Sequence, residues 1–161
     1  MLKNNDIIMY DEQYQKFKKI LDNFLVVSAS KFVFLLSTSG QILVESGETE
    51  ELDVTSLASL VAGSVSATGG LADLIGESNF SVLFHEGVET NVYISIVTEK
   101  MILVIIFPKR TPLGLVRLKM RSITPSLQRT YQELVKRMSE SDNSKLLENV
   151  TDEDLDSLFD F

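Results

Sequence analysis

The chain has 161 residues and a net charge of −8, and 44% of its residues are hydrophobic, so one domain with a sizeable buried core is expected. It has no cysteine and a single histidine, which excludes disulfides and cysteine chemistry and disfavours a histidine metal cluster or a Ser-His-Asp triad. No continuous apolar run reaches the roughly 18 residues that cross a bilayer, and we expect a cytoplasmic protein that is not itself an enzyme and holds no cofactor or metal.

The N-terminal part of the chain predicts a helix followed by a β-hairpin. From Tyr10 to Phe24 the apolar residues recur at spacings of four and three, which places them on one face of a helix that starts near Met9. Residues 31–36 form a continuous aromatic and branched run, which is typical of a central strand. Turn-forming residues then lead into a return strand at 41–45.

A second helix is expected from Val54 to Ile75, with Asp53 as its N-cap and Gly76 after its last turn. On a helical projection, most of its larger apolar side chains gather on one arc, which we interpret as the core face. The opposite arc carries small residues, and Asp73 is its only charge. The core arc comprises Leu57, Leu60, Val61, Thr68, Leu71 and Ile75, and the small-residue arc comprises Ala58, Ser59, Ala62, Gly63, Ser66, Gly69 and Gly70.

The glycines of the small-residue arc indicate that something docks there. A glycine in a helix interior costs about 1 kcal/mol relative to alanine, so Gly63, Gly69 and Gly70 together cost about 3 kcal/mol. Such a cost indicates that another backbone must approach closely. The partner is either the same helix of a second copy, since homodimers are the commonest oligomers, or a different protein. An arc left by drift alone is the third interpretation.

Three strands and a long helix are expected in the second half of the chain. The strands are predicted at 80–84, 92–97 and 101–107. Thr111 is predicted to cap the following helix, with Pro112 at its first position. The apolar stripe of this helix comprises Val116, Met120, Ile123, Leu127, Tyr131, Leu134 and Met138.

The C-terminal end of the chain predicts a tethered helix. Polar residues without periodicity follow Met138 and are interpreted as a flexible linker. Thr151 and Asp154 have the spacing of a capping box at the start of a short helix. The order α-β-β-α-β-β-β-α indicates an α+β fold. The division is a domain over 1–138, a linker over 139–149 and an amphipathic helix over 150–161, whose apolar residues are Leu155, Leu158 and Phe159.

Charge is unevenly distributed along the chain. Residues 1–108 hold 14 acids and 6 bases, residues 109–138 hold 8 bases and one acid, and residues 139–161 hold 8 acids and one base. A basic segment followed by an acidic tail suggests ionic contacts within the molecule or with a partner. Nucleic acid is not an expected partner, because the tail would repel phosphate and no basic surface interleaved with aromatic residues is present.

Three other candidate sites are weaker. His85 and Glu86 could form an acid–base pair, but a lone histidine near a turn is more often structural. Arg110, Arg117 and Arg121 could supply an arginine finger to a GTPase, although a solvated basic helix face is the simpler interpretation. The chain has no phosphate-binding loop motif, so it is not expected to hydrolyse nucleotides itself.

Several segments resemble the roadblock (dynein light chain) family. The most specific is the second helix, over 54–77, and the resemblance continues through Phe84-His-Glu-Gly and residues 103–107. It extends further through Arg110-Thr-Pro-Leu-Gly-Leu-Val-Arg-Leu and the ending at 152–159. Together these segments cover most of the chain from about residue 31, and the order of elements agrees with a roadblock-type domain with a five-stranded antiparallel sheet.

The resemblance implies a homodimer whose sheets join edge to edge and whose central helices lie side by side. It also implies that one Ras-like small GTPase binds on that helical surface and hydrolyses GTP faster, because its switch regions are reshaped without an inserted catalytic residue. Cell polarity and gliding motility, with concentration at one cell pole, are the implied context. A scaffold that binds a GTPase or motor complex without faster hydrolysis stays open. The GTPase-binding residues would be Ser59, Ala62, Gly63, Ser66, Ala67 and Gly70.

Two further contacts are predicted. The strand at 80–84 is short, apolar and nearly uncharged, and an open edge of this kind invites aggregation. We therefore expect it to pair with a second copy, with Phe80, Val82 and Phe84 at the dimer interface. The C-terminal helix is too short to be stable alone, so Leu155, Leu158 and Phe159 need an apolar groove. That groove lies either on the basic third helix around Arg117 and Arg121 or on the GTPase, and we favour the GTPase.

Overall fold

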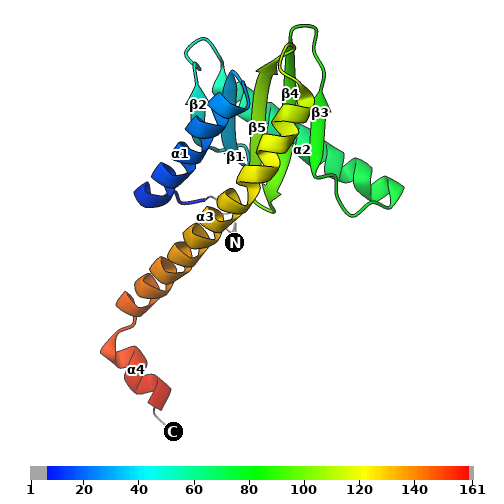
Figure 1. Cartoon of the computed structure of the whole chain (residues 1–161). Helices are drawn as coiled ribbons and strands as arrows, with labels where there is room; N and C mark the ends of the chain where they lie inside the picture. The colour runs from blue at the N-terminus through cyan, green and yellow to red at the C-terminus, as the bar shows by residue number, and fades with distance from the viewer. Residues whose placement is uncertain (1–6, 160–161) are drawn as a thin grey trace.

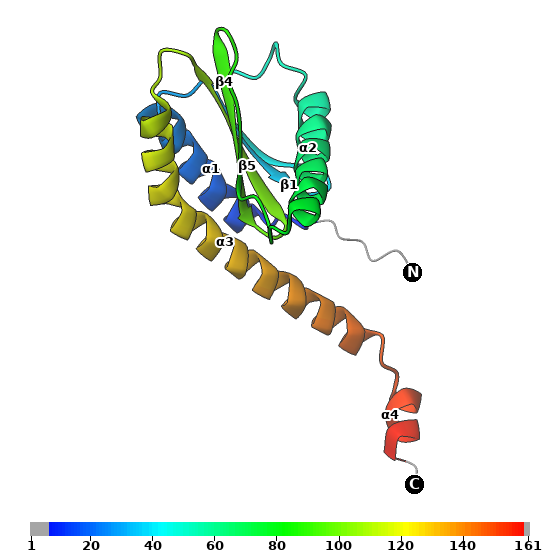
Figure 2. The same cartoon turned by 90° about the vertical axis from the view of Figure 1, so that its right-hand side faces the viewer.

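Helices cover both faces of a five-stranded antiparallel sheet in the computed structural model, which describes residues 7–159 apart from the side chain of Phe159 (Figure 1). α1 and α3 lie on one face, and α2 lies on the other (Figure 2). The strand order is β2-β1-β5-β4-β3, so β2 and β3 form the two edges. The predicted α+β fold and order of elements are confirmed. The helices are α1 (Asp11–Val27), α2 (Val54–Ile75), α3 (Leu113–Glu148) and α4 (Asp152–Phe159), and the strands are β1 (Phe32–Ser37), β2 (Ile42–Gly47), β3 (Val82–His85), β4 (Thr90–Thr98) and β5 (Met101–Pro108).

The central strands β1 and β5 are buried along almost their whole length, because helices cover both faces of the sheet. Successive side chains alternate between the two faces, so the sheet separates two hydrophobic cores. The core facing α2 is built from bulky side chains of three strands. These are Phe34, Leu36, Ile94, Ile102, Val104 and Ile106.

The predicted apolar faces of α1 and α3 are confirmed and form the second core with the sheet. Phe17, Leu21 and Phe24 of α1 are fully buried, and so are Leu127 and Leu134 of α3. Ion pairs between the two helices flank this core, but exposed pairs contribute at most about 1 kcal/mol each, so apolar contact holds the helices together. The flanking contacts are the 2.7 Å ion pair between Lys16 Nζ and Glu133 Oε2 and the Arg137 guanidinium 4.5 Å from the centre of the Tyr10 ring.

The starts of two helices differ from the sequence-based expectation. α1 begins at Asp11 rather than near Met9. Thr111 does not cap α3, since Pro112 takes the N-cap position and the Thr111 hydroxyl donates to the Ala29 carbonyl at 2.8 Å. Ala29 has a φ of 51° in the tight turn between α1 and β1. Thr111 therefore fastens that turn to the start of α3 instead of capping its own helix.

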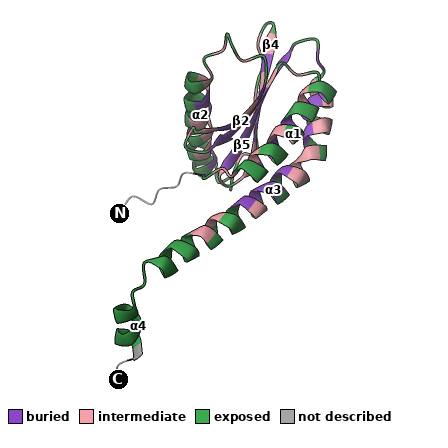
Figure 3. Ribbon diagram, turned by 90° about the vertical axis from the view of Figure 1, so that its left-hand side faces the viewer, coloured by how far each residue is buried: buried purple, intermediate pink, exposed green. Residues whose placement is uncertain are grey.

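Residues 139–148, which we predicted to be a flexible linker, are the last turns of α3. They have no apolar periodicity because they pack on nothing, and almost all are exposed (Figure 3). Absence of periodicity indicates absence of burial, and it is not a helix-breaking signal in the way that glycine or proline would be. α3 therefore projects from the domain as a continuous helix, and α4 lies beyond its end (Figure 1).

Candidate functional site

α2 has the boundaries that the sequence predicts, and both ends are fixed by local hydrogen bonds. The Asp53 carboxylate accepts from the Ser56 hydroxyl at 2.6 Å and from the Ser56 backbone N–H at 3.1 Å, and these bonds lower the pKa of Asp53. At the other end, Gly76 has a φ of 77°, a left-handed conformation that favours glycine. The helix is therefore defined independently of what covers its outer side.

The side of α2 that packs on the sheet differs from the prediction. Ala58, which we assigned to the small-residue arc, is buried with Val61 and Ala72. Leu60 and Leu71, which we assigned to the core face, point to solvent. The reason is that the sheet already supplies large side chains on this face, so short side chains fit between helix and strands. The prediction failed because apolar residues occur nearly all round this helix.

Large apolar side chains remain uncovered along the outer side of α2. Leu60, Leu71, Leu74 and Ile75, here called the apolar strip, are 70%, 54%, 86% and 61% exposed. α2 is long and apolar enough to cross a membrane by length and composition alone, yet only 17% of its most apolar window is buried. This strip is not among the surfaces predicted from the sequence, although a helix that is apolar on all sides signals a second partner beyond its own sheet.

Beside the apolar strip lies a surface of very small residues. Ser59, Gly63, Ser66, Ala67 and Gly70, here called the small-residue strip, are all exposed. The sixth residue predicted to bind the GTPase, Ala62, is half-buried at its margin. The six predicted residues thus lie along one helix, in neighbouring positions on its outer side.

The glycines of α2 have no role in packing within the chain. A Cβ atom built at Gly63, Gly69 or Gly70 would meet no atom within 4 Å. The intrinsic cost of glycine in a helix is therefore not offset by any close approach that this chain makes. The small-residue strip is bare because nothing in the described part of the chain, residues 7–159, covers it, which is the property expected of a surface shaped for an external backbone.

The N-terminal half of the small-residue strip rests on a hairpin turn. Gly40, in the turn between β1 and β2, has a φ of 92°, and a Cβ there would lie 3.5 Å from Ser59 Cα and 3.6 Å from Ala62 Cβ. The turn therefore supports α2 at van der Waals distance below the strip.

β3 is an edge strand, as predicted, but it covers Val82–His85 rather than residues 80–84. Phe80 therefore precedes the strand, whereas Val82 and Phe84 lie in it and are half-buried. Phe84 stacks on Phe107 with ring centres 6.3 Å apart. His85 is exposed at the end of the strand. The C-terminal turns of α2 project past β3 (Figure 1), so the open edge and the end of the apolar strip lie at the same side of the molecule.

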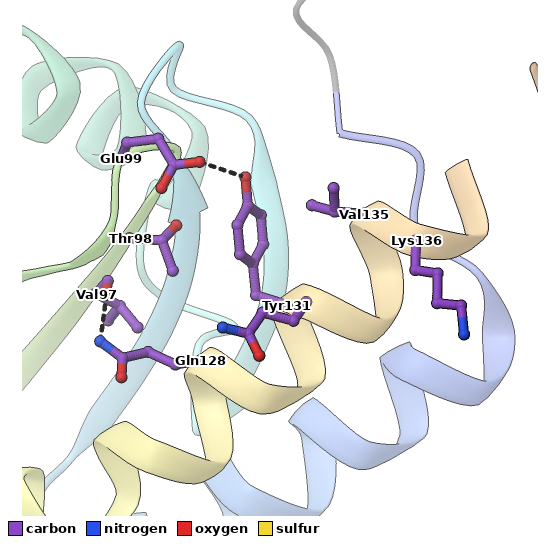
Figure 4. A pocket seen from close by; sticks show the side chains of 8 residues that line it. Val97, Thr98, Glu99, Gln128, Tyr131, Val135 and Lys136 are labelled. Atoms are coloured by element: carbon purple, nitrogen blue, oxygen red, sulfur yellow. Dashed lines mark hydrogen bonds between the residues drawn. The ribbon is translucent and has the colours of Figure 1, made fainter. Parts of the chain in front are cut away.

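A pocket of about 610 Å³ lies on the other face of the sheet, between the β4–β5 turn and α3. Tyr131 stands at its centre and donates to Glu99 Oε1 at 3.2 Å (Figure 4). Burial, and then the nearby Glu99 carboxylate, raise the pKa of Tyr131. Gln128 Nε2 donates to the Val97 carbonyl at 3.1 Å and closes one side. The remaining lining residues are Thr98, Gln132, Val135 and Lys136.

The C-terminal helix forms where the sequence predicts it, although residues 160 and 161 lie outside the described residues. The capping box is present: the Thr151 N–H donates to Asp154 Oδ2 at 3.0 Å, and the Asp154 N–H donates to Thr151 Oγ1 at 3.3 Å. Leu155 and Leu158 are exposed. The side chain of Phe159 lies outside the described part of the chain, so its predicted contact stays a prediction.

Comparison with known proteins agrees with this architecture. Residues 16–107 match the Roadblock/LC7 domain family, a segment that runs from α1 to the end of β5. MglB from Myxococcus xanthus is 42% identical, with a TM-score of 0.75 over 79% of this chain and 96% of that chain. A search of curated protein sequences found no match.

Two further MglB structures have the same fold. The gliding protein MglB from Thermus thermophilus is 27% identical, with a TM-score of 0.74 over 80% of this chain and 97% of that chain. An MglB described with a tetrameric arrangement is 26% identical, with a TM-score of 0.75 over the same shares of the two chains. The chain belongs to the Roadblock/LC7 family and is an MglB-type roadblock protein.

Proposed function

We propose that two copies of this chain pair and bind one Ras-like small GTPase, of the MglA type, on the small-residue strips of their α2 helices. The observation that carries the proposal is an exposed helix surface that bears glycines without any packing role among residues 7–159. Asp73 is the only charged residue in α2. A surface of this kind lets a partner backbone approach closely.

The two strips of α2 allow self-pairing and GTPase binding at the same time. The apolar strip and the small-residue strip occupy neighbouring arcs of the helix. Large uncovered leucines suit a permanent contact between copies, because burying each contributes about 1.5–3 kcal/mol. The small-residue strip then stays open beside that contact. The homodimer therefore presents two such strips close together, which fits one GTPase per dimer.

The proposed mechanism is faster GTP hydrolysis without a catalytic residue from this chain. None of the five residues of the small-residue strip is an acid, a base or an arginine that could enter the nucleotide site, and the one charged residue of α2 is Asp73. It can seat a switch loop so that the GTPase's own arginine and glutamine are held in position, and positioning of this kind lowers the barrier to phosphoryl transfer. α3, which carries the exposed Arg117 and Arg121, lies on the opposite face of the sheet from α2 (Figure 2).

The related proteins give the proposal its biological setting. One relative carries the name gliding protein, and another is described with a tetrameric arrangement. We therefore propose a cytoplasmic regulator of cell polarity and motility that assembles at least as a homodimer and acts at one cell pole. The alternative is a scaffold that binds the GTPase without stimulating hydrolysis. Phosphate release by the GTPase, timed with and without this chain, separates the two.

The small-residue strip is tested by the double substitution Ser66→Arg and Gly70→Arg. Two long cations would hold a switch loop away from the helix, so we expect loss of GTPase binding and stimulation while the dimer persists. Gln15→Arg with Asn23→Arg, on exposed positions of α1 across the sheet, is the matched control and should behave like the parent. Full stimulation by the strip variant would place the GTPase elsewhere, and a monomeric variant would favour self-pairing through this strip.

We further propose that α4 makes a second contact with the GTPase through Leu155, Leu158 and Phe159. Truncation after Lys145 should leave the dimer intact but weaken GTPase affinity or change the rate of nucleotide exchange. Titration with a fluorescent nucleotide on full-length and truncated protein measures both quantities. Identical affinity and exchange rate would show that the tail does not contact the GTPase.

A further inference from the structure

The leucines of the C-terminal helix cannot reach Tyr131 or the basic stretch of their own α3. About 26 Å of helix separates Tyr131 from Glu148, at a rise of about 1.5 Å per residue. The residues between α3 and α4 span at most about 14 Å when fully extended, and Leu155 and Leu158 lie about 5 and 9 Å further along, so even full extension falls short of Tyr131. The basic residues Arg117 and Arg121 are farther still. The contact with its own basic helix that the sequence left open therefore requires α3 to unfold.

The short linker is also held in a folded conformation. The Asn149 N–H donates to the Lys145 carbonyl at 3.2 Å, and the Val150 N–H donates to the Leu147 carbonyl at 3.3 Å. These bonds close the C-terminal end of α3 and leave less length for a reversal. A surface beside Tyr131 that covers α4 must therefore belong to another molecule.

The pocket beside α3 has the chemistry that α4 requires. Val97, Tyr131 and Val135 give it an apolar floor (Figure 4). Val135 is 41% exposed, so part of its side chain is free to make an apolar contact. The leucines of α4 have the size and spacing to enter such a pocket, since Leu155 and Leu158 are one turn apart on one side of the helix.

Charge complements this apolar match. Lys136 lines the pocket, and the exposed Arg129 lies two turns earlier on the same side of α3. Glu99 is the one carboxylate among the lining residues, and the Tyr131 hydroxyl donates to it. On α4, Asp152, Asp154 and Asp156 flank the two leucines. An acidic helix with an apolar ridge thus faces an apolar pocket with a cationic rim.

We propose that α4 docks in trans, into the pocket between the β4–β5 turn and α3 of a second copy. This contact lies on the opposite face of the sheet from α2, so it can link one homodimer to another without displacing the pairing through α2. The inference rests on the proposed function in one respect only: while α4 is docked in this way, it cannot contact the GTPase.

Sedimentation of the full-length chain without any GTPase tests the docking. We expect a species heavier than the basic unit at about 0.05 M salt that is lost at about 0.5 M salt, because exposed charges are then screened. Leu155→Asp with Leu158→Asp should abolish it, and so should Arg129→Glu with Lys136→Glu. Circular dichroism should show that both double variants keep the parent's fold, since all four residues are exposed.

Mixing the two double variants is the decisive experiment. The tail variant still has a pocket and the pocket variant still has a tail, so the mixture should regain part of the heavier species while each variant alone does not. The inference is overturned if the parent shows no heavier species, if either variant associates like the parent, or if the mixture stays dissociated. In the first case, protection of α4 only on addition of the GTPase would identify the GTPase as its occupant. Hydrolysis assays test the proposed function separately.

Discussion

At the scale of single residues, Gly63 is a direct test of the small-residue strip, because no described atom lies next to the position of its missing Cβ. A Cβ atom at this position meets nothing within 4 Å, and the residue lies in the interior of a helix. We predict that Gly63→Ala raises the free energy of unfolding by about 0.5–1 kcal/mol, since alanine loses less backbone entropy on folding. The same methyl group should weaken GTPase stimulation, because it holds the partner backbone off the helix.

Gly114 provides the matched control for this prediction. It too is helical and meets nothing within 4 Å, but it lies at the start of α3 on the other face of the sheet. Gly114→Ala should therefore leave stimulation unchanged. Urea unfolding and phosphate release measure the two properties. If Gly63→Ala left stimulation at the parent level, the glycine would reflect drift and the small-residue strip would lose its main support.

At the scale of elements, β3 presents open backbone groups to a second copy. The Ile96 N–H donates to the Ser81 carbonyl at 2.9 Å, and Val82 pairs with Ser95 in the ladder. In an antiparallel ladder, bonded and non-bonded pairs alternate, so the N–H groups of Val82 and Phe84 point away from β4. These outward groups are the ones that an edge-to-edge dimer would use.

We predict that Val82→Pro breaks the dimer without breaking the sheet, because it removes an outward donor only. Leu83→Pro is the contrasting variant, since the Leu83 N–H points towards β4 and its loss should destabilise the fold itself. Chromatography with light scattering should report monomers or insoluble protein for Val82→Pro. A soluble dimer of unchanged mass would exclude β3 as the paired edge.

The orientation of a helix could be predicted from the sequence only where charged residues occupy its outer side. The inward faces of α1 and α3 could be predicted because lysines, arginines and acids occupy their outer sides. α2 has one charge, so its boundaries were predictable from Asp53 and Gly76 while its orientation was not. The small side chains of Ala58 and Ala72 face the sheet because the strands supply the bulk, which the local sequence does not reveal.

The candidate surface was predictable in part for the same reason. Five of the six residues assigned to GTPase binding are exposed, because small residues without charge were read as a docking surface and not as core. The apolar strip beside them was missed, since large apolar residues such as Leu60 were read as core. Residues 139–148 were misread as a linker because nothing packs against them.

At the scale of the whole molecule, the sheet separates two working surfaces. α2 has one charged residue, whereas α1 and α3, which lie on the other face (Figure 2), carry most of the basic residues of the chain. The acidic tail extends from the basic face and ends far from its own domain (Figure 1). A partner on α2 and a partner on α3 therefore meet different chemistry and can bind without excluding each other.

Because α3 continues as a helix to Glu148, its length sets how far α4 lies from the domain, and its rotation sets which way α4 faces. Each inserted residue advances α4 by about 1.5 Å and turns it by about 100°. Two alanines inserted after Asp142 should swing the leucines of α4 to the far side and abolish its contacts, whereas four should return them to within about 40° and restore much of the binding. If the connection were flexible, both insertions would change the binding of α4 to the same extent. Titration of the two variants against the GTPase would show whether α3 holds α4 in a fixed orientation or only connects it flexibly to the domain.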